Sequence, residues 1–407
     1  MIRELTIYSS PCYTVDMIKT YRCEAYLTDS QKDMANQFFG IARYIYNWGL
    51  ETKIKAYEET QKSPSCFDLI KLLTPMKSEL TWLADAPAQA MQMQLRNLDN
   101  AFNAFFNQQN RFPRFRSRKK PIQSLQFPQS VSVKEDLVTL PKLGKVKVCG
   151  LRKFDGIIKT TTLSRTATGR FFISILVDDG KDLPPKPVPR ETTVLGIDLG
   201  VKDLAILSNG EKIPNPKHLK SSERRLAVKQ RQLSRKKLGS KNRLDARFKV
   251  AKVHERIKNR RSDYLHKISH KIVCESQATL IGLEDLNVGG MIKNHSLAKA
   301  ISDVAWSQLV EQLTYKSDWY GVNLVKIGRF EPSSKLCSAC GAINKELTLK
   351  DRRWTCVCGA THDRDINAAQ NIKRYAWLTY SKTRTAGQLS EDKQSLIERS
   401  ALAGAMK

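Results

Sequence analysis

Hydrophobic residues recur at helical spacing in the first quarter of the chain. A short strand over residues 21–27 is followed by Thr28 to Gln31, a capping-box pattern that predicts a helix start. The next helix carries Met34, Phe38, Ile41 and Ile45 on one face, and a second long helix is predicted to begin near Pro87. Its apolar face comprises Met91, Leu95, Leu98, Phe102 and Phe105. These two helices are expected to pack through their apolar faces.

The pattern changes to β-rich between residues 124 and 177. Runs over 144–148, 157–162 and 171–177 are separated by glycine and polar turns, which predicts a small barrel or sandwich. Four prolines, Pro184, Pro185, Pro187 and Pro189, then indicate a stiff linker. A new domain is expected to open near Thr192.

Two buried strands of this second domain are predicted to end in acids. Asp198 follows the apolar run 194–197, and Glu284 follows the run 279–283. Asp365 lies between a segment that contains four cysteines and a predicted helix that includes Ala368 and Ala369. Each acid alone could cap a helix or pair with an arginine. Converging carboxylates are normally held together by divalent cations, so the set predicts two Mg²⁺ ions about 4 Å apart.

Four cysteines stand immediately upstream of Asp365. Cys337 and Cys340 form a C-x2-C pair, and Cys356 and Cys358 form a tighter C-x-C pair followed by Gly359. This is close to the ribbon spacing that binds one structural Zn²⁺ ion, and Gly359 tolerates the sharp turn that a one-residue gap requires. The alternative is four unligated thiols. The other cysteines, Cys12, Cys23, Cys66, Cys149 and Cys274, are scattered as small buried hydrophobes would be.

The charge balance favours a polyanionic partner. The 407 residues contain 69 Lys and Arg against 40 Asp and Glu, a formal net charge of +29, which points to nucleic acid. We find no apolar run of eighteen residues and no signal-peptide core, so we expect no membrane association and a soluble, cytoplasmic protein. With 41% hydrophobic residues, the chain can build several folded cores.

Two basic stretches are candidate nucleic-acid contacts. The loop 111–120 alternates cations with phenylalanines, as suits a phosphate backbone and a stacked base, and the alternative is a solvated loop with its aromatic rings packed beneath. The stretch 217–271 holds 20 Lys or Arg against 4 Asp or Glu and is expected to form two helices. The candidate residues are Arg114, Arg116, Lys119, Lys120, Arg231, Arg235, Lys236, Lys237, Arg256, Arg260 and Arg261.

Several motifs together resemble one family. The segments 196–200, 282–286 and 362–369, the cysteine pairs, and the segments 43–47, 112–116, 140–144 and 301–303 are similar to TnpB, a protein encoded by bacterial and archaeal insertion sequences and related to type V CRISPR effectors. The segment 43–47 adds Arg43 and Asn47 as candidate nucleic-acid contacts. The C-x-C pair departs from the commoner C-x2-C of the family.

The resemblance implies a multidomain α/β fold. A β-barrel wedge domain (1–34 and 121–190) is expected to carry a helical recognition insert (35–120). An RNase H-like RuvC nuclease domain (191–332 and 362–377) is expected to carry a zinc ribbon (333–361). The polar tail 378–407 has the composition of a disordered segment.

The resemblance also implies an activity and a role for each acid. It implies Mg²⁺-dependent, RNA-guided cleavage of double-stranded DNA beside a short transposon-adjacent motif, with Asp198, Glu284 and Asp365 as catalytic metal ligands. Asp363 competes for the third place, and we favour Asp365 because the acid of the family precedes x-Asn-Ala-Ala. The expected partners are a guide RNA from the 3′ end of the protein's own element and target DNA, with a monomer favoured. The alternatives are an RNA-guided DNA-binding repressor, a transposase with an RNase H-like acid triad, or a zinc-ribbon nucleic-acid-binding protein.

Overall fold

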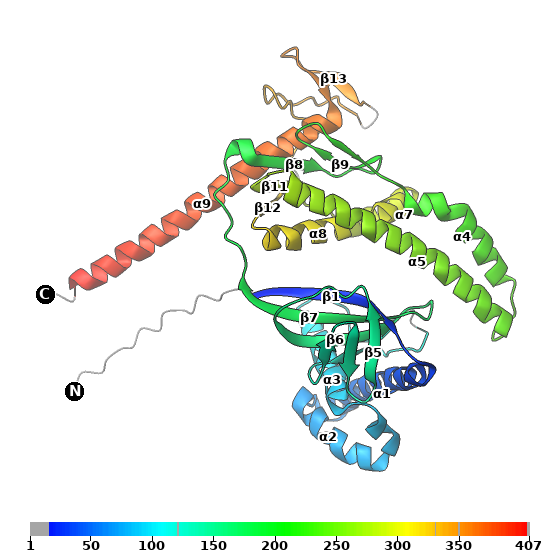
Figure 1. Cartoon of the computed structure of the whole chain (residues 1–407). Helices are drawn as coiled ribbons and strands as arrows, with labels where there is room; N and C mark the ends of the chain where they lie inside the picture. The colour runs from blue at the N-terminus through cyan, green and yellow to red at the C-terminus, as the bar shows by residue number, and fades with distance from the viewer. Residues whose placement is uncertain (1–15, 120–121, 330, 349–350, 405–407) are drawn as a thin grey trace. The chain divides into compact units, whose positions relative to one another are not determined.

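The chain divides into two compact units, Met1–Asp182 and Leu183–Lys407. The computed structural model of the protein describes residues 16–119, 122–329, 331–348 and 351–404 (Figure 1). The division falls just before the proline-rich segment, where the sequence predicts a linker. Each unit is described separately below.

The first unit combines one antiparallel sheet with a group of helices. Its sheet has the strand order β2-β6-β7-β1-β5-β4-β3, in which β1 pairs with β7 on one side and β5 on the other. The strands are β1 (Asp16–Tyr26), β2 (Gln123–Phe127), β3 (Ser132–Lys134), β4 (Leu137–Leu140), β5 (Gly144–Cys149), β6 (Ile157–Arg165) and β7 (Phe171–Asp182). The three predicted runs therefore all form strands. β2 and β3 are the first and last strands of this order, and the order alone does not establish that they meet. The closed barrel therefore stays a prediction.

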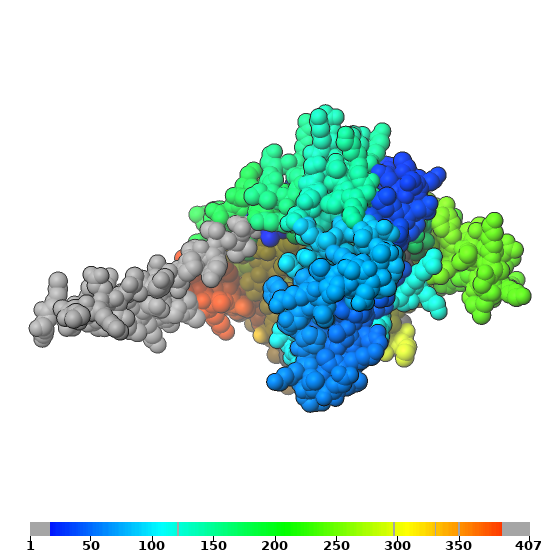
Figure 2. Space-filling view, turned by 90° about the horizontal axis from the view of Figure 1, so that it is seen from below, coloured from blue at the N-terminus to red at the C-terminus, as the bar shows by residue number. Residues whose placement is uncertain are grey.

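The helices of this unit follow β1 directly. They are α1 (Asp29–Thr60), α2 (Cys66–Glu79) and α3 (Ala88–Phe106), with a 3₁₀ turn over Thr81–Asp85. Thr28 and Gln31 form the predicted capping box, and α3 begins after Pro87 as expected. Phe38, Ile41 and Ile45 of α1 are buried in one core with Met91 and Leu95 of α3. In Figure 2 the helical part of this unit, in blue, adjoins its strands, in blue-green.

The second unit contains a mixed five-stranded sheet. Its order is β10-β9-β8-β11-β12: β8, β9 and β10 pair antiparallel, whereas β8, β11 and β12 are parallel. The strands are β8 (Val194–Asp198), β9 (Asp203–Leu207), β10 (Lys212–Pro214), β11 (Leu280–Glu284) and β12 (Asn323–Ile327). The predicted hairpin and the second acid-ended strand are thus confirmed.

Helices cover both faces of this sheet. One face, with Leu195, Ile197 and Leu283, shares a core with residues of α5 (Lys241–His270) and α8 (Trp306–Trp319). The other face packs on α9 (Arg364–Gly404) through a core that contains Val194, Leu280 and Ile372. α5 continues into a π-helical turn over Lys271–Glu275. The remaining helices of the unit are α4 (His218–Ser234), α6 (Val288–Met291) and α7 (His295–Val304), with a 3₁₀ turn over Glu191–Thr193.

Two features of this unit bear on the sequence predictions. α4 and α5 form the two expected basic helices, which lie side by side in an antiparallel hairpin (Figure 1). The tail is different from our expectation, because α9 runs on to Gly404 as one helix. The tail lacks proline and contains good helix formers such as Leu389 and Glu398, so a helix that has already nucleated can continue through it. Among the described residues, no helix combines the length and the apolar character that crossing a bilayer requires.

Candidate functional site

Asp198 and Glu284 lie at the carboxyl ends of neighbouring parallel strands. In the register of β8 and β11, Leu283 is opposite Ile197. The next residue of each strand is the acid, so the two carboxylates come from adjacent positions at one edge of the sheet. Polar groups at this edge of an open α/β sheet are where ligands usually bind.

α9 supplies Asp365 through an unusually close approach to the sheet. A Cβ atom on Gly196 would lie 2.1 Å from the Ala369 carbonyl oxygen, and one on Gly282 would lie 2.5 Å from the Ala376 Cβ atom. Asp365 is one helical turn before Ala369, and Asp198 is two residues after Gly196, on the same strand face. The close packing therefore directs the start of α9 to the strand ends that carry the other two acids.

The electrostatics of Asp198 show that the three acids influence one another. Burial raises the pKa of Asp198, and the negative charges of Glu284 and Asp365 raise it further, to about 7, against the opposing effect of Arg364. A cation that offsets this repulsion would lower the pKa and favour the ionised carboxylate. Carboxylate oxygens are the ligand type that hard divalent ions prefer, which is the chemistry that the sequence predicts for these three acids.

Asp363 and Asp365 have different surroundings. Asp365 faces two cations: its Oδ2 lies 3.4 Å from Nη1 of Arg352, and its Oδ1 lies 3.8 Å from Nε of Arg364. Asp363 forms an ion pair with Lys212, with 2.7 Å between Oδ2 and Nζ. Its Oδ1 atom accepts hydrogen bonds of 3.2 Å from the backbone N–H groups of Asp365 and Ile366. Although burial opposes it, these partners hold the pKa of Asp363 below its usual value. Asp363 is therefore the carboxylate that caps α9.

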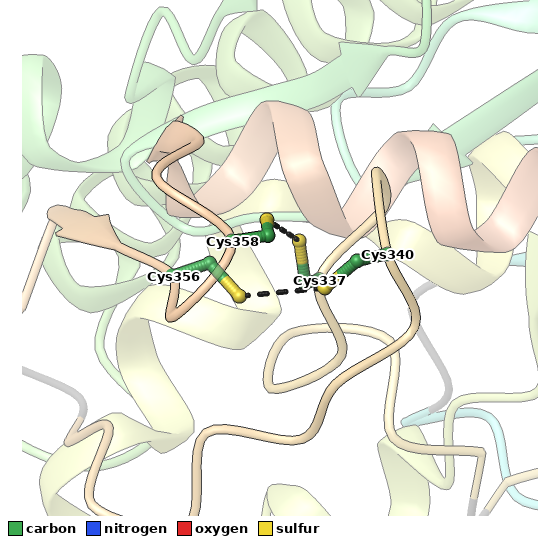
Figure 3. A group of neighbouring side chains, drawn as sticks. All are labelled: Cys337, Cys340, Cys356 and Cys358. Carbon is green, nitrogen blue, oxygen red and sulfur yellow. Dashed lines mark hydrogen bonds between the residues drawn. The ribbon is translucent and has the colours of Figure 1, made fainter.

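The four predicted cysteines form a compact cluster (Figure 3). Their sulfur atoms all lie within 4.8 Å of one another, with 3.9 Å between Cys337 and Cys358 and 3.6 Å between Cys340 and Cys356. A tetrahedral zinc ion with bonds of about 2.3 Å would place its sulfur ligands about 3.8 Å apart. The cluster fits a zinc ion, and the C-x-C pair contributes both of its sulfurs.

Tight turns bring the two cysteine pairs into position. Gly341 and Gly359 each follow a pair with positive φ, +80° and +86°, and their N–H groups bond to the carbonyl oxygens of Cys337 and Cys356 at 2.9 Å. The expectation that Gly359 permits a sharp turn is confirmed. The short strands β13 (Arg353–Thr355) and β14 (Thr361–Asp363) close this segment, which we call the ribbon.

In the second unit, most of the predicted nucleic-acid contacts are exposed. Arg231, Arg235, Lys236 and Lys237 lie at the end of α4 and in the turn that follows, and Arg256 and Arg260 lie on α5. Arg261 differs, because its Nη2 donates a 2.9 Å hydrogen bond to Asp303, a buried acid of α7. Asp303 also accepts from the backbone N–H of Leu219 at the start of α4. Arg261 therefore joins helices within the protein.

In the first unit, three predicted contacts are bound to other protein groups. Arg43 donates to Gln123 at 2.6 Å, and Asn47 exchanges hydrogen bonds with the backbone of Arg116 at 2.7 and 3.0 Å. The Arg116 guanidinium lies 3.7 Å from the Tyr46 ring centroid, and Phe112 packs edge-on against Phe102 and Phe105. The basic loop is thus anchored on α1 and α3, while Arg114 and Lys119 are exposed. Lys120 lies outside the described residues.

Two neighbours of these sites were not predicted from the sequence. Arg352 reaches Asp365 from the ribbon, and the Nε2 atom of His362 lies 3.1 Å from the Cys337 sulfur. Burial raises the pKa of this thiol, but backbone N–H groups and His362 outweigh burial and lower it to about 6. His362 reaches the cysteine cluster from β14, where it is paired with Trp354 of β13. The sequence signal for this contact was the closeness of His362 to the second cysteine pair.

Comparison with solved structures defines the class of fold. The chain aligns with the protein in "Cryo-EM structure of the Cas12f1-sgRNA-target DNA complex" with a TM-score of 0.53, covering 88% of this chain and 99% of that chain at 13% identity. The likeness is one of fold: this protein has the mixed α/β architecture of the Cas12f class. A family model described as "Cas12f1-like, TNB domain" also matches residues 306–372, which include the ribbon.

Comparison with curated sequences defines the family. A protein of Streptomyces pristinaespiralis named "Putative RNA-guided DNA endonuclease" is 42% identical over 87% of this chain and 88% of its own. "Putative RNA-guided DNA endonuclease InsQ" of Escherichia coli K12 is 31% identical over 83% of this chain and 87% of its own. Family models described as "Probable transposase" and "Helix-turn-helix domain" match residues 174–295 and 17–62. The chain belongs to the TnpB family.

Proposed function

We infer that this protein is an RNA-guided DNA endonuclease whose hydrolytic site is formed by Asp198, Glu284 and Asp365. Membership of the TnpB family supports the activity. The observation that carries the site assignment is geometric: Asp198 and Glu284 follow paired residues at the ends of β8 and β11, and the close packing of α9 on the same strands brings its first turn, with Asp365, to these ends. The raised pKa of Asp198, caused by burial and by the charges of the other two acids, agrees with this placement. The mixed sheet, with three consecutive antiparallel strands extended by two parallel strands, supports a RuvC-like nuclease domain.

Each of the three acids has a separate part in this proposal. Asp198, Glu284 and Asp365 would hold two Mg²⁺ ions, which when bound activate a water molecule and stabilise the leaving oxygen of a phosphodiester. Asp198 joins the set from a buried strand, so its orientation is fixed by the core. Asp363 instead holds the first turn of α9 and thereby keeps Asp365 at the strand ends. Arg352 and Arg364 balance the charge of Asp365.

The cysteine cluster would hold one Zn²⁺ ion, which stabilises the ribbon. The sulfur spacing and the two glycine turns support this ligand set. The ribbon is attached to α9 by buried side chains, because Asn367 donates to the carbonyl oxygen of Leu336 at 2.7 Å. A folded ribbon therefore keeps Arg352 beside Asp365.

The partners in this proposal are a guide RNA from the 3′ end of the protein's own element and double-stranded target DNA, bound by one copy of the chain. The exposed cations of α4 and α5 support contact with phosphates, which positions strands without reading their sequence. Base pairing with the guide would select the target, and the protein would read a short flanking motif. Arg114 and Lys119 of the first unit would add phosphate contacts, whereas Arg43, Asn47 and Arg116 would support the loop that carries them.

The decisive experiment compares the native protein with Asp198→Ala. Both proteins are purified with RNA from the 3′ end of their element and given a plasmid that carries the matching target. We expect cleavage by the native protein, no cleavage by Asp198→Ala, and equal binding of RNA and target by both. Glu51→Gln, an exposed acid of α1 paired with Lys55, is the control and should cleave normally.

Other outcomes would assign a different function. Equal cleavage by native protein and Asp198→Ala would remove the assigned chemistry. Target binding without cleavage by the native protein would indicate an RNA-guided repressor. Joining of labelled transposon ends would indicate a transposase.

A further inference from the structure

Ser333, the first residue of the ribbon segment, contacts one of the three acids. It belongs to the segment that leads from β12 to Cys337, and the residue is only 6% exposed. Its hydroxyl donates a short hydrogen bond, 2.5 Å, to Oε1 of Glu284. A buried hydroxyl that donates to one oxygen of a carboxylate limits rotation of that carboxylate and leaves the second oxygen available to another ligand.

The backbone of Ser333 is held by a fully buried side chain of α9. Asn371 donates to the carbonyl oxygen of Ser333 at 2.8 Å and to that of Leu336 at 2.6 Å. Asn367, one turn earlier on α9, donates to Leu336 and accepts from the backbone N–H of Ser338 at 2.9 Å. α9 thus fixes Ser333 and the first cysteine turn of the ribbon together.

The same helix also carries Asp365. The position of Ser333 is therefore set by the element that brings the third acid to the strand ends. In metal sites, the groups that hydrogen-bond a ligating carboxylate commonly fix its orientation, and their loss typically lowers metal affinity or activity by about 10- to 100-fold.

We propose that Ser333 is a positioning residue: its hydroxyl holds Glu284 in the orientation in which this carboxylate binds a catalytic divalent cation. The proposal rests on the proposed function, because it takes Glu284 as a metal ligand. It adds that the ribbon and the acid site are mechanically connected through Asn371, Ser333 and Glu284.

A second serine of the same interface provides a matched control. The Ser338 hydroxyl donates to Gln370 of α9 at 2.8 Å, so it also joins the ribbon to this helix, but its partner is an exposed amide. Ser338→Ala removes a hydrogen bond of the same kind from the same interface. Ser333→Thr keeps the hydroxyl at residue 333 and serves as the conservative variant.

The test measures metal binding and cleavage separately. Mn²⁺ is titrated into each RNA-free full-length protein by calorimetry, and Asp198→Ala identifies the heat that belongs to the acid site. In a second experiment, target cleavage by each RNA-loaded protein is measured across Mg²⁺ concentrations. For Ser333→Ala we expect Mn²⁺ affinity to fall, and the Mg²⁺ concentration for half-maximal cleavage to rise, by about tenfold or more. Ser333→Thr should recover most of both, and Ser338→Ala should match the native protein.

The outcomes separate this proposal from the proposed function. Zinc content and melting temperature that match between Ser333→Ala and Ser338→Ala would show that the ribbon remains folded. The proposal is overturned if the two variants bind Mn²⁺ equally, or if the native protein shows no Mn²⁺ binding that depends on Asp198. A native protein that binds Mn²⁺ in this way but cleaves no target would contradict the proposed function, while the Mn²⁺ comparison would still decide the role of Ser333.

Discussion

The cysteine cluster and the acid group are both candidate metal sites, but the chain builds them differently. Two tight turns with glycines at positive φ bring the sulfur atoms within 4.8 Å of one another. The acids arrive from β8, β11 and α9, and burial together with repulsion by the other two acids raises the pKa of Asp198 to about 7. The ribbon site is therefore set mainly by local backbone geometry, whereas the acid site depends on how distant elements pack.

This difference predicts which changes affect each site. A substitution in the ribbon should first alter zinc binding and local stability. A substitution where α9 packs on the sheet should alter the acid site while zinc stays bound.

The largest effect is expected from removing a cysteine ligand. Structural zinc contributes about 10 kcal/mol or more of apparent binding free energy, which becomes folding free energy of the ribbon. Cys340→Ser should therefore lose most of its zinc and should be cut by proteases within the ribbon. Cys149→Ser, an exposed cysteine of the first unit, is the control and should keep one zinc ion per chain. A full zinc content in Cys340→Ser, measured by atomic emission, would contradict the ligand assignment.

The next effect is expected from the third acid. Asp365→Ala should lower the single-turnover cleavage rate by about 10³-fold or more, since a bound metal ion supplies several kcal/mol of transition-state stabilisation. Asp363→Ala should retain much of the activity and should lose about 1 kcal/mol of stability, as expected for a lost helix cap. The roles would be exchanged if Asp363→Ala lost cleavage to the same extent at an unchanged melting temperature.

A smaller effect is expected from the packing of α9 on the sheet. The Cβ atom of Gly196→Ala would lie 2.1 Å from the Ala369 carbonyl oxygen and 2.4 Å from the Lys373 backbone nitrogen, neither of which can move as a side chain does. We expect a loss of about 1–3 kcal/mol in unfolding free energy and weaker cleavage, with zinc retained.

A second glycine provides the control for this effect. Gly40→Ala, on α1, meets its nearest side-chain atom at an ordinary 3.8 Å and should be neutral or slightly stabilising. Zinc loss from Gly196→Ala would show that the two sites are not separable in this way.

The sequence was sufficient for features that depend on local patterns. The capping box at Thr28, the start of α3 after Pro87, the acid-ended strands β8 and β11, and the cysteine cluster were all predicted and are all observed. Each depends on spacing within a short segment, or on ligand chemistry that few other patterns satisfy.

Features that depend on tertiary contacts could not be predicted in the same way. Arg261 directly follows Arg260 in the same basic run, and only the fold shows that Arg261 is bound to the buried Asp303. Asn47 and Arg116 are far apart in sequence and meet only because α1 packs beneath the basic loop. The partnership of Ser333 with Glu284 likewise depends on α9, which follows both of them in the chain.

The pH dependence of stability tests the acid site by itself, and its sign follows from Asp198. Its pKa in the folded, metal-free protein is raised to about 7 from a usual 3.8, so the folded state binds this proton more tightly than the unfolded state does. The stability contributed by Asp198 is fully present below about pH 4 and is lost as the pH rises towards 7. Asparagine carries no charge at any pH, so Asp198→Asn removes this loss.

Without divalent ions, Asp198→Asn should therefore melt a few degrees above the native protein at pH 8, and the two melting temperatures should converge towards pH 4. Added Mg²⁺ should reduce or reverse the difference at pH 8, since it stabilises only a protein that can bind it. Scanning calorimetry at several pH values, with and without Mg²⁺, tests both expectations, and Glu51→Gln controls for the loss of a negative charge elsewhere. Parallel melting curves for Asp198→Asn and the native protein would show that the three acids do not repel one another, and the contrast between the acid site and the cysteine cluster would then fail.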